Sequence, residues 1–297
     1  MRFAKGHGTE NDFVILLDPD GREGLSRALA ARLCDRRAGI GADGVLRAVR
    51  TTAMAQAAET GEAGSGYAGD GVPGPGAEPG TEWFMDYRNA DGSVAEMCGN
   101  GIRVFARYLA EHGLTEGKEF TVATRSGPRH VRLDAPGGDG KITVDMGRVA
   151  VLGPGSAVIG GRSYDGMRVS VGNPHLACLV DAPLASFDLS RPPALDPGQF
   201  PGGGNVELVQ LTGPRSVAMR VHERGSGETR SCGTGAVAAA AAAAAAAPAE
   251  IGQEWDPWSV TVPGGELTVT LDAGRAWLTG PAVIVAEGEL APAWLAG

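Results

Sequence analysis

The stretch SCGTGAV (residues 231–237) runs directly into alanines that continue to residue 247. Alanine is the strongest helix former, so the run predicts a helix over residues 236–247 that ends at Pro248. Cys232, one of only 4 cysteines in the chain, therefore stands between a serine and a glycine at the start of a helix. A cysteine that only packs would lie within an apolar run. Cys232 does not, and it is the first candidate for chemistry.

A second stretch, MCGNGIRVFARYLAEHG (residues 97–113), repeats the pattern Cys-Gly-polar-Gly before a predicted helix at residues 102–112. Upstream, GHGTENDFVILL (residues 6–17) and VGNPHLACLV (residues 171–180) share a glycine, an asparagine and an apolar strand. Asn11 and Cys98 are 87 positions apart, or 57 without a 30-residue insertion, and Asn173 and Cys232 are 59 apart. The matching order and spacing predict a duplicated domain whose two cysteine loops are related by a pseudo-two-fold axis.

The rest of the chain favours an α+β fold. Most apolar runs, such as DFVILL, KITVDM and LTVTL, are short and bounded by Gly or Pro, which is typical of strands. Only one further helix is expected, at residues 25–36. Residues 51–80 are rich in Gly, Ala and Pro and nearly lack large apolar side chains, so they predict a flexible surface insertion. Many strands and few helices do not fit a doubly wound parallel sheet.

Length and charge limit the class of protein. At 297 residues two domains are expected, an N-terminal one over residues 1–145, to which residues 279–297 return, and a C-terminal one over residues 146–278. A net charge of −9 and a pI near 5.1 argue against nucleic-acid and anionic-membrane partners. Four cysteines do not form a secreted disulfide framework, and the N-terminus lacks the features of a signal peptide. We expect a cytoplasmic protein.

Each cysteine loop combines an anion site with a reactive sulfur. The first N–H groups of a helix have no intrahelical partner and carry partial positive charge, and glycine lets an anion approach the backbone closely. The N–H groups of Gly99 and Asn100, and those of Gly233 and Thr234, can therefore bind a carboxylate. The same field favours a thiolate, which predicts a cysteine pKa lowered towards neutrality.

Two such loops on one carboxylate would place a sulfur on either side of its α-carbon. One thiolate could remove the α-proton while the opposite thiol returned a proton to the other face, which inverts the stereocentre without a cofactor or a metal. Zinc is not expected because neither loop has a second cysteine or histidine at ligand spacing. The alternative for either loop is a small buried cysteine at a helix start. Cys34 and Cys178, on a predicted helix and strand, are interpreted as packing residues.

With these loops, further motifs resemble the diaminopimelate epimerase family over nearly the whole chain apart from the insertion. They are, in chain order, GHGTENDFV, GIGADGV, YRNADGS, MCGNGIR, GNPH, NVELV and ERGSGETRSCGTGA. The resemblance implies two pseudo-symmetric domains, each a curved, mostly antiparallel sheet around a central helix, with the active site in the interdomain cleft. It also implies a homodimer and the cofactor-independent interconversion of LL- and meso-2,6-diaminopimelate, on the route to lysine and peptidoglycan.

The resemblance also assigns residues. It implies that Cys98 and Cys232 are the acid/base pair and that His175 supports activity. The substrate-binding positions that it implies are Asn11, Asn89, Gly99, Asn100, Asn173, Asn205, Glu223, Arg224, Gly233 and Thr234. Arg224 suits a two-pronged clamp on a distal carboxylate and Glu223 suits an ammonium group. For the asparagines, ordinary turn chemistry is the alternative, most of all for Asn89 in NADG.

The chain departs from the family at two places. Relatives often have Phe-Asp-Gln where this chain has Ala42-Asp43-Gly44, and many have another cysteine where it has Val237 and alanines. Two rival functions stay open: a proline or hydroxyproline racemase, which also uses paired cysteines, and a binding protein without catalysis. The first has no need of a clamp such as the one Arg224 suits, and the second would have lost a cysteine, whereas both are present.

Overall fold

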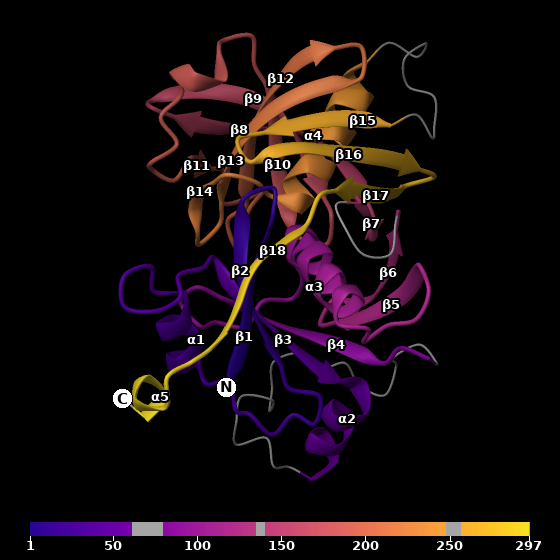
Figure 1. The fold of residues 1–297 in the computed structure, drawn as a ribbon. Helices are drawn as coiled ribbons and strands as arrows, with labels where there is room; N and C mark the ends of the chain where they lie inside the picture. Colours follow the sequence, from indigo (N-terminus) through magenta and orange to yellow (C-terminus); the bar gives the residue numbers. More distant parts are fainter. Residues whose placement is uncertain (61–79, 135–139, 248–256, 297) are drawn as a thin grey trace. The chain divides into compact units, whose positions relative to one another are not determined.

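The computed structural model describes residues 1–60, 80–134, 140–247 and 257–296, and contacts divide the chain into two compact units (Figure 1). Unit 1 consists of Met1–Gly8, Asp12–Val144 and Pro281–Gly297. Unit 2 consists of Thr9–Asn11 and Asp145–Gly280. The end of the chain therefore belongs to the N-terminal unit, while three residues of the GHGTEN motif belong to unit 2.

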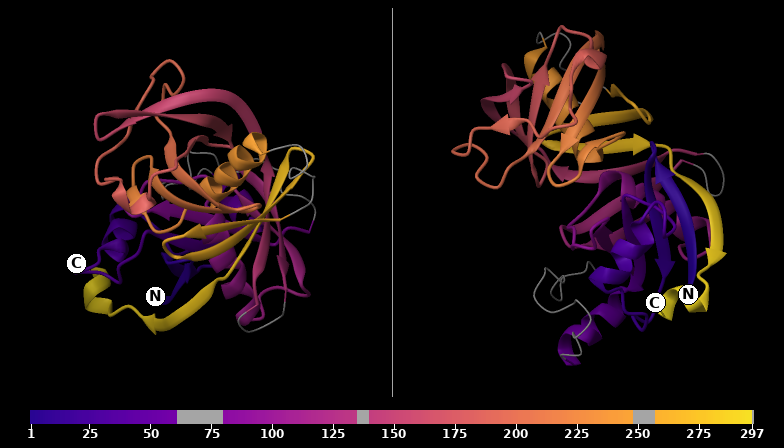
Figure 2. Two further views of the ribbon diagram at one scale, coloured as in Figure 1. Left: turned by 90° about the horizontal axis from the view of Figure 1, so that it is seen from above. Right: turned by 90° about the vertical axis from the view of Figure 1, so that its left-hand side faces the viewer.

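The sheet of unit 1 is mostly antiparallel. The last strand of the chain, β18 (Val283–Glu289), lies antiparallel beside β1 (Arg2–Gly8), as the yellow and indigo strands of Figure 2 show. The order continues through β2 (Asn11–Leu17), β3 (Gly44–Arg50), β4 (Trp83–Asn89), β5 (Glu119–Thr124), β6 (Gly127–Leu133) and β7 (Ile142–Arg148). Here β2/β3 and β4/β5 are parallel, and β3/β4, β5/β6 and β6/β7 are antiparallel.

Unit 2 repeats this order of pairing. Its sheet runs through β8 (Ala150–Ile159), β9 (Arg162–Ser170), β10 (Pro174–Leu179), β12 (Asn205–Gly213), β13 (Ser216–Glu223), β15 (Trp258–Val262), β16 (Gly265–Asp272) and β17 (Arg275–Gly280). The third and fifth pairings, β10/β12 and β13/β15, are again parallel, and the others are antiparallel. Two short strands, β11 (Ala194–Leu195) and β14 (Gly227–Thr229), flank β8 and β13. The two units therefore have the same strand topology.

Each sheet packs on a long buried helix at an equivalent place in the strand order. Helix α3 (Gly99–Glu111) follows β4 and contacts β1, β3 and β18, and its residues from Gly99 to Leu109 are buried. Helix α4 (Gly233–Ala246) follows β14, contacts strands from β8 to β17, and is buried from Gly233 to Ala243. The predicted α+β class, with mostly antiparallel sheets and few helices, is confirmed.

The remaining helices are short. Helix α1 (Arg27–Cys34) starts at the N-cap Ser26, whose hydroxyl accepts from the N–H of Leu29 at 3.1 Å. It lies within the predicted residues 25–36. The C-terminal helix α5 (Pro292–Ala296) and the 3₁₀ turn η1 (Leu184–Ser186) were not expected from the sequence. The helices predicted at residues 102–112 and 236–247 are present as α3 and α4, and both begin three residues earlier, at the glycine after the cysteine.

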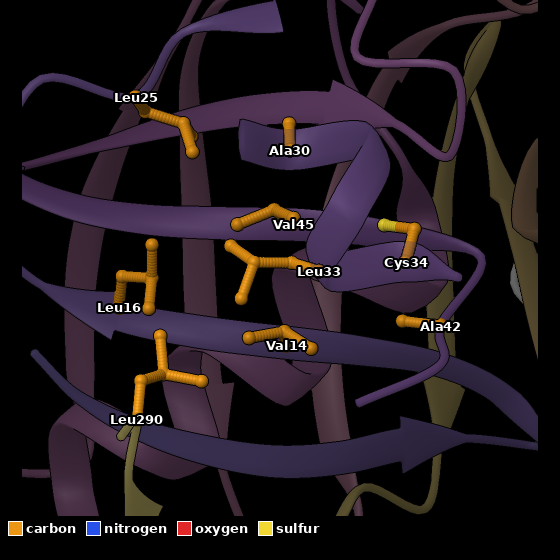
Figure 3. Packing of buried hydrophobic residues seen from close by; sticks show 9 residues of the cluster. All are labelled: Val14, Leu16, Leu25, Ala30, Leu33, Cys34, Ala42, Val45 and Leu290. Carbon is orange, nitrogen blue, oxygen red and sulfur yellow. The ribbon is translucent and has the colours of Figure 1, made fainter. Parts of the chain in front are cut away.

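The two cysteines interpreted as packing residues lie in separate cores. Cys34 belongs to a cluster in unit 1 with Val14, Leu33 and Val45, drawn in Figure 3. Cys178 is fully buried in a cluster of unit 2 with Leu176 and Leu208. Burial raises the pKa of each of these two thiols to about 12. Neither is therefore a thiolate near neutral pH.

The expected flexible insertion at residues 51–80 differs from the structure at its start. Residues Thr51–Thr60 form helix α2, and Met54 is buried beside Val49, Phe84 and Ala123. The sequence TTAMAQAAET holds helix-forming Ala, Met and Gln, which the Gly- and Pro-rich composition of the whole segment obscured. The hydroxyl of Thr51 donates to the carbonyl oxygen of Thr81 at 2.7 Å, so the segment leaves and re-enters the fold at one point. Residues 61–79 lie outside the described residues.

Candidate active site

Cys98 and Cys232 occupy the same position and have the same backbone geometry in their units. Each is the N-cap of its helix, with φ −136° and ψ 123° at Cys98 and φ −129° and ψ 118° at Cys232. The Sγ of Cys98 accepts from the N–H of Gly101 at 3.4 Å, and that of Cys232 accepts from the N–H of Gly235 at 3.3 Å. The sulfur therefore takes the place of the usual hydroxyl or carboxylate cap.

The second glycine of each loop is required by this cap. A Cβ at Gly101 would lie 3.3 Å from the Cβ of Cys98. At Gly235 it would lie 3.2 Å from the Cβ of Cys232 and 2.8 Å from Oε1 of Glu207. The sulfur accepts from the N–H of the third helical residue, and the N–H groups of the first two helical residues have no acceptor within the helix. In the two loops these are the predicted pairs, Gly99 with Asn100 and Gly233 with Thr234.

Cys232 is in a more acidic and more buried setting than the sequence suggested. Its side chain is buried, and burial raises its pKa well above the usual value, with the carboxylates of Glu223 and Glu207 adding to the effect. The Thr234 hydroxyl and the Gly235 N–H act in the opposite direction. The expected lowering towards neutrality is wrong for Cys232, because desolvation and two carboxylates outweigh the partial charge of the helix end. In the free protein this residue is a thiol at neutral pH.

Hydrogen bonds connect several predicted residues to Cys232 within unit 2. Parallel pairing of β10 with β12 places His175 opposite Asn205. Nε2 of His175 lies 3.0 Å from Oδ1 of Asn173, whose Nδ2 donates to Oγ1 of Thr234 at 3.4 Å. That hydroxyl lies 3.5 Å from Sγ of Cys232. The sequence motifs GNPH, NVELV and SCGTG thus meet around one sulfur.

The ERGSGE motif supplies two further predicted residues of unit 2. Oε1 of Glu223 accepts from the hydroxyl of Thr229, and burial raises the pKa of the Glu223 carboxyl group. The backbone N–H of Arg224 donates to Oδ1 of Asn205 at 2.9 Å. The Arg224 side chain is exposed, and its Nη1 donates to the carbonyl oxygen of Gly202 at 3.1 Å. Most of this guanidinium is therefore open to a ligand.

Asn11 is joined to unit 2 although it lies near the N-terminus. Thr9 and Glu10 have positive φ values of 51° and 60°, so the chain turns sharply before Asn11, which is buried. Oγ1 of Thr9 lies 2.6 Å from Oγ of Ser231, the residue before Cys232. This contact fixes the turn to the cysteine loop. Thr9 and Ser231 were not predicted as site residues, and no signal in the sequence singled them out.

In unit 1, a buried arginine lies near Cys98. Arg103 is fully buried on α3, where Nη1 donates to the carbonyl oxygen of Gly99 at 3.1 Å and Nη2 donates to Oδ1 of Asn100 at 3.0 Å. Burial lowers the pKa of Arg103 to about 10, and the charge on Cys98 acts against that shift. By reciprocity the guanidinium favours the thiolate of Cys98. Arg103 was missed because an arginine inside a helix is typical of an exposed face.

Asn89 is half-buried, and its hydrogen bonds are those of a turn, which was the alternative to a substrate-binding role. Its Nδ2 donates to Oγ of Ser93 at 3.0 Å, and its N–H donates to the carbonyl oxygen of Ser93 at 2.9 Å.

Gly44 stands where many relatives have a glutamine. A Cβ on Gly44 would lie 2.7 Å from the ring of Tyr87. A glutamine therefore does not fit at position 44 in this conformation.

The described residues contain neither a metal-binding cluster of three or more side chains nor a membrane-spanning helix. Among them, no group of three or more His, Cys, Asp or Glu could hold a metal ion. No described helix is both long and apolar enough to cross a membrane.

Comparisons with known proteins agree with these motifs. The family model for diaminopimelate epimerase matches residues 3–152 and 167–285. A diaminopimelate epimerase of Thermobifida fusca is 59% identical over 290 residues, covering 98% of each chain. One of Rhodococcus opacus is 51% identical over 302 residues, covering 100% of this chain and 99% of the relative.

Solved structures share the fold at low identity. A probable proline racemase of Agrobacterium radiobacter matches with a TM-score of 0.67 and 13% identity, over 98% of this chain and 93% of its own. A hydroxyproline epimerase of Agrobacterium vitis matches with a TM-score of 0.60 and 13% identity, over 97% and 91%. Such identities show a common fold and nothing about substrate.

Proposed function

This chain belongs to the diaminopimelate epimerase family, and we propose that it interconverts LL- and meso-2,6-diaminopimelate with Cys98 and Cys232 as its two acid/base groups. The observation that carries the proposal is the pair of matched cysteine caps, each of which places a sulfur at the start of a helix beside its first backbone N–H groups. Inversion of a stereocentre needs a base on one face of the α-carbon and an acid on the other. Two equivalent loops provide these groups.

The proposed reaction starts with the substrate carboxylate on the N–H groups of Gly99, Asn100, Gly233 and Thr234. Removal of the α-proton moves negative charge onto this carboxylate, where the helix-start N–H groups stabilise it. One sulfur must begin as a thiolate and the other as a thiol. The acidic, buried surroundings of Cys232 keep it protonated, and the Arg103 guanidinium favours the thiolate of Cys98. We therefore propose Cys98 as the first base and Cys232 as the first acid.

The remaining predicted residues form the proposed recognition set for the rest of the substrate. Arg224, largely exposed and fixed by one bond to Gly202, would clamp the distal carboxylate through two parallel hydrogen bonds. Glu223 would meet an ammonium group, whose positive charge favours the ionised form of its carboxylate. Asn11, Asn89, Asn173 and Asn205 would donate to carboxylate oxygens and accept from ammonium groups.

The distal clamp is tested by replacing Arg224 with lysine. A point charge cannot reproduce a two-pronged contact, so we expect KM for LL-diaminopimelate to rise about tenfold or more, with a smaller fall in kcat. Arg168→Lys is the matched control, because Arg168 is also an arginine of unit 2 whose side chain donates to backbone carbonyl oxygens. An unchanged KM in Arg224→Lys would locate the distal contact at another residue.

Proline racemisation is the rival reaction on this fold. It is disfavoured because the relatives at 50% identity or more are diaminopimelate epimerases, whereas the proline-type structures are 13% identical. Deuterium incorporation from D₂O distinguishes the two. We expect exchange at the α-carbon of LL-diaminopimelate and none with L-proline. Exchange with L-proline alone would support the rival reaction.

The family also suggests where the protein acts and in what form. We propose a cytoplasmic homodimer in lysine and peptidoglycan-precursor biosynthesis. All four cysteines are free thiols, and the proposed chemistry needs the reduced state that a cytoplasm maintains. Sedimentation equilibrium measures the oligomeric state, and a mass near the 30.3 kDa of one chain would contradict the dimer.

A further inference from the structure

Glu207 of β12 is a fully buried carboxylate that the proposed reaction does not use. Its Oε1 lies 2.7 Å from Nδ1 of His175, which is also fully buried. Its Oε2 has no hydrogen-bond partner among the described residues. A buried carboxylate is costly unless it is paired, so a half-satisfied one in a strand of apolar neighbours indicates a role other than packing.

A line of hydrogen bonds leads from Glu207 to the sulfur of Cys232. Nδ1 of His175 lies against Oε1 of Glu207 and Nε2 lies against Oδ1 of Asn173, and because both partners are acceptors, the two contacts are hydrogen bonds when each ring nitrogen carries a hydrogen. The amide of Asn173 then reaches the hydroxyl of Thr234, and this hydroxyl contacts Sγ of Cys232. Each member holds the next in one orientation, so the position of the Glu207 carboxylate determines how Thr234 meets the sulfur.

Glu207 also lies directly against the start of α4. Its Oε1 is the atom that a Cβ on Gly235 would approach to 2.8 Å. The partial positive charge of the helix start stabilises a carboxylate at that point. The same closeness brings a negative charge to the sulfur that caps this helix.

The groups that face Cys232 and Glu207 come from every element around them. They are Glu223 on β13, His175 and Cys178 on β10, and the Thr234 hydroxyl and Gly235 N–H on α4. Of the acidic groups in this set, Glu223 and Glu207 both raise the pKa of Cys232.

We propose that Glu207 is a positioning residue for Cys232: it orients the His175–Asn173–Thr234 hydrogen bonds that end on Sγ and holds a negative charge beside that sulfur. The inference rests on the proposed role of Cys232 as an acid/base group. Its chemical consequence is that Glu207 keeps Cys232 in the thiol form, as the proposed role of Cys232 as the first acid requires. A residue that only packs would have neither effect.

The test is Glu207→Gln, which removes the charge and nearly keeps the shape. Thiolate absorbance at 240 nm in a Cys98→Ser background reports Cys232 once the absorbance of the Cys98→Ser/Cys232→Ser variant is subtracted, because Cys34 and Cys178 contribute equally to both. We expect the midpoint of Cys232 to fall by about one pH unit. With Cys98 intact, we expect kcat to fall about tenfold or more and KM to change little. Glu228→Gln is the control, since Glu228 is an exposed carboxylate of unit 2 paired with Arg220.

A wild-type midpoint in folded Glu207→Gln, or an equal shift in Glu228→Gln, would overturn the inference. If Glu207→Gln does not fold, Glu207→Asp decides, since it keeps the charge but withdraws it from His175 by one methylene group. We expect Glu207→Asp to lower kcat while the Cys232 midpoint stays near that of the wild type, and an unchanged kcat would overturn the inference. Activity of Cys232→Ser tests the proposed function separately, because a turning-over Cys232→Ser variant contradicts that function whatever Glu207 does.

Discussion

The cysteine loops at the starts of α3 and α4 have one geometry and opposite electrostatic surroundings. Their N-cap φ and ψ values agree within 7° and their cap distances within 0.1 Å. Yet Cys98 is only partly buried and lies near the guanidinium of Arg103, whereas Cys232 is buried and lies near Glu207 and Glu223. The repeated backbone supplies the anion site, and the unrepeated side chains decide which sulfur holds a proton.

The difference in charge around the two cysteines comes from residues of α3 and α4 as well as from neighbouring strands. In α3 the buried arginines Arg103 and Arg107 donate to backbone carbonyl oxygens, including those of Gly99 and Ala282. In α4 the corresponding positions hold valine and alanine, and the charged side chains near Cys232 come from neighbouring strands instead. A two-base reaction needs one thiolate and one thiol at the start, so asymmetric surroundings suit it better than two identical ones.

Loss of either sulfur has the largest expected effect. Cys98→Ala and Cys232→Ala each remove one of two required proton-transfer groups, so we expect epimerisation to fall by about 10⁴-fold or to be undetectable. The assay is conversion of LL- to meso-diaminopimelate by chiral chromatography. Cys34→Ala and Cys178→Ala are the matched controls and should lower stability while turnover by the folded protein is kept. Near-normal turnover by Cys98→Ala or Cys232→Ala would contradict the two-base reaction.

Removal of the basic group near Cys98 comes next. Arg103→Met should make the Cys98 thiolate form at higher pH and lower kcat/KM at neutral pH by about tenfold to a hundredfold. Arg107→Met is the control because Arg107 is buried on the same helix one turn further from the cysteine. Equal losses in the two variants would mean that Arg103 acts through packing alone.

The glycines at the caps give the smallest difference between the loops. Gly235→Ala should reduce activity more than Gly101→Ala, because its Cβ would meet the Glu207 carboxylate at 2.8 Å, while the nearest atoms to Gly101 lie at 3.3 Å. We expect a several-fold ratio in kcat/KM, measured alongside thermal unfolding to separate strain from misfolding. A larger loss in Gly101→Ala would show that the Cys98 loop is the tighter one.

Much of the fold could be predicted from the sequence, because strands and helices follow local patterns. Short apolar runs between Gly and Pro gave the strands, and the repeated CG-x-G loops indicated the duplicated topology. The helix starts were predicted three residues late, since glycine has low helix propensity and the sulfur cap compensates for it. Helix α2 was missed because its short helical sequence is diluted by the composition of residues 51–80.

The surroundings of the site could be predicted only in part. The family motifs named the polar residues, and the structure connects Asn173, His175 and Asn205 near Cys232. The direction of the Cys232 pKa shift was wrong because a helix start is visible in sequence, whereas burial and charges from distant strands are not. Glu207 did leave a signal, a carboxylate among the apolar residues of NVELV, and it was passed over.

One titration tests the central claim that two loops of the same geometry hold cysteines of different protonation state. Thiolate absorbance at 240 nm is followed with pH in Cys232→Ser, which reports Cys98, and in Cys98→Ser, which reports Cys232. The spectrum of the double variant is subtracted from each. The account predicts that Cys98 ionises at clearly lower pH than Cys232, whose pKa is raised well above the usual value. Ionisation of Cys232 at the same pH as Cys98, or at a lower one, would contradict it.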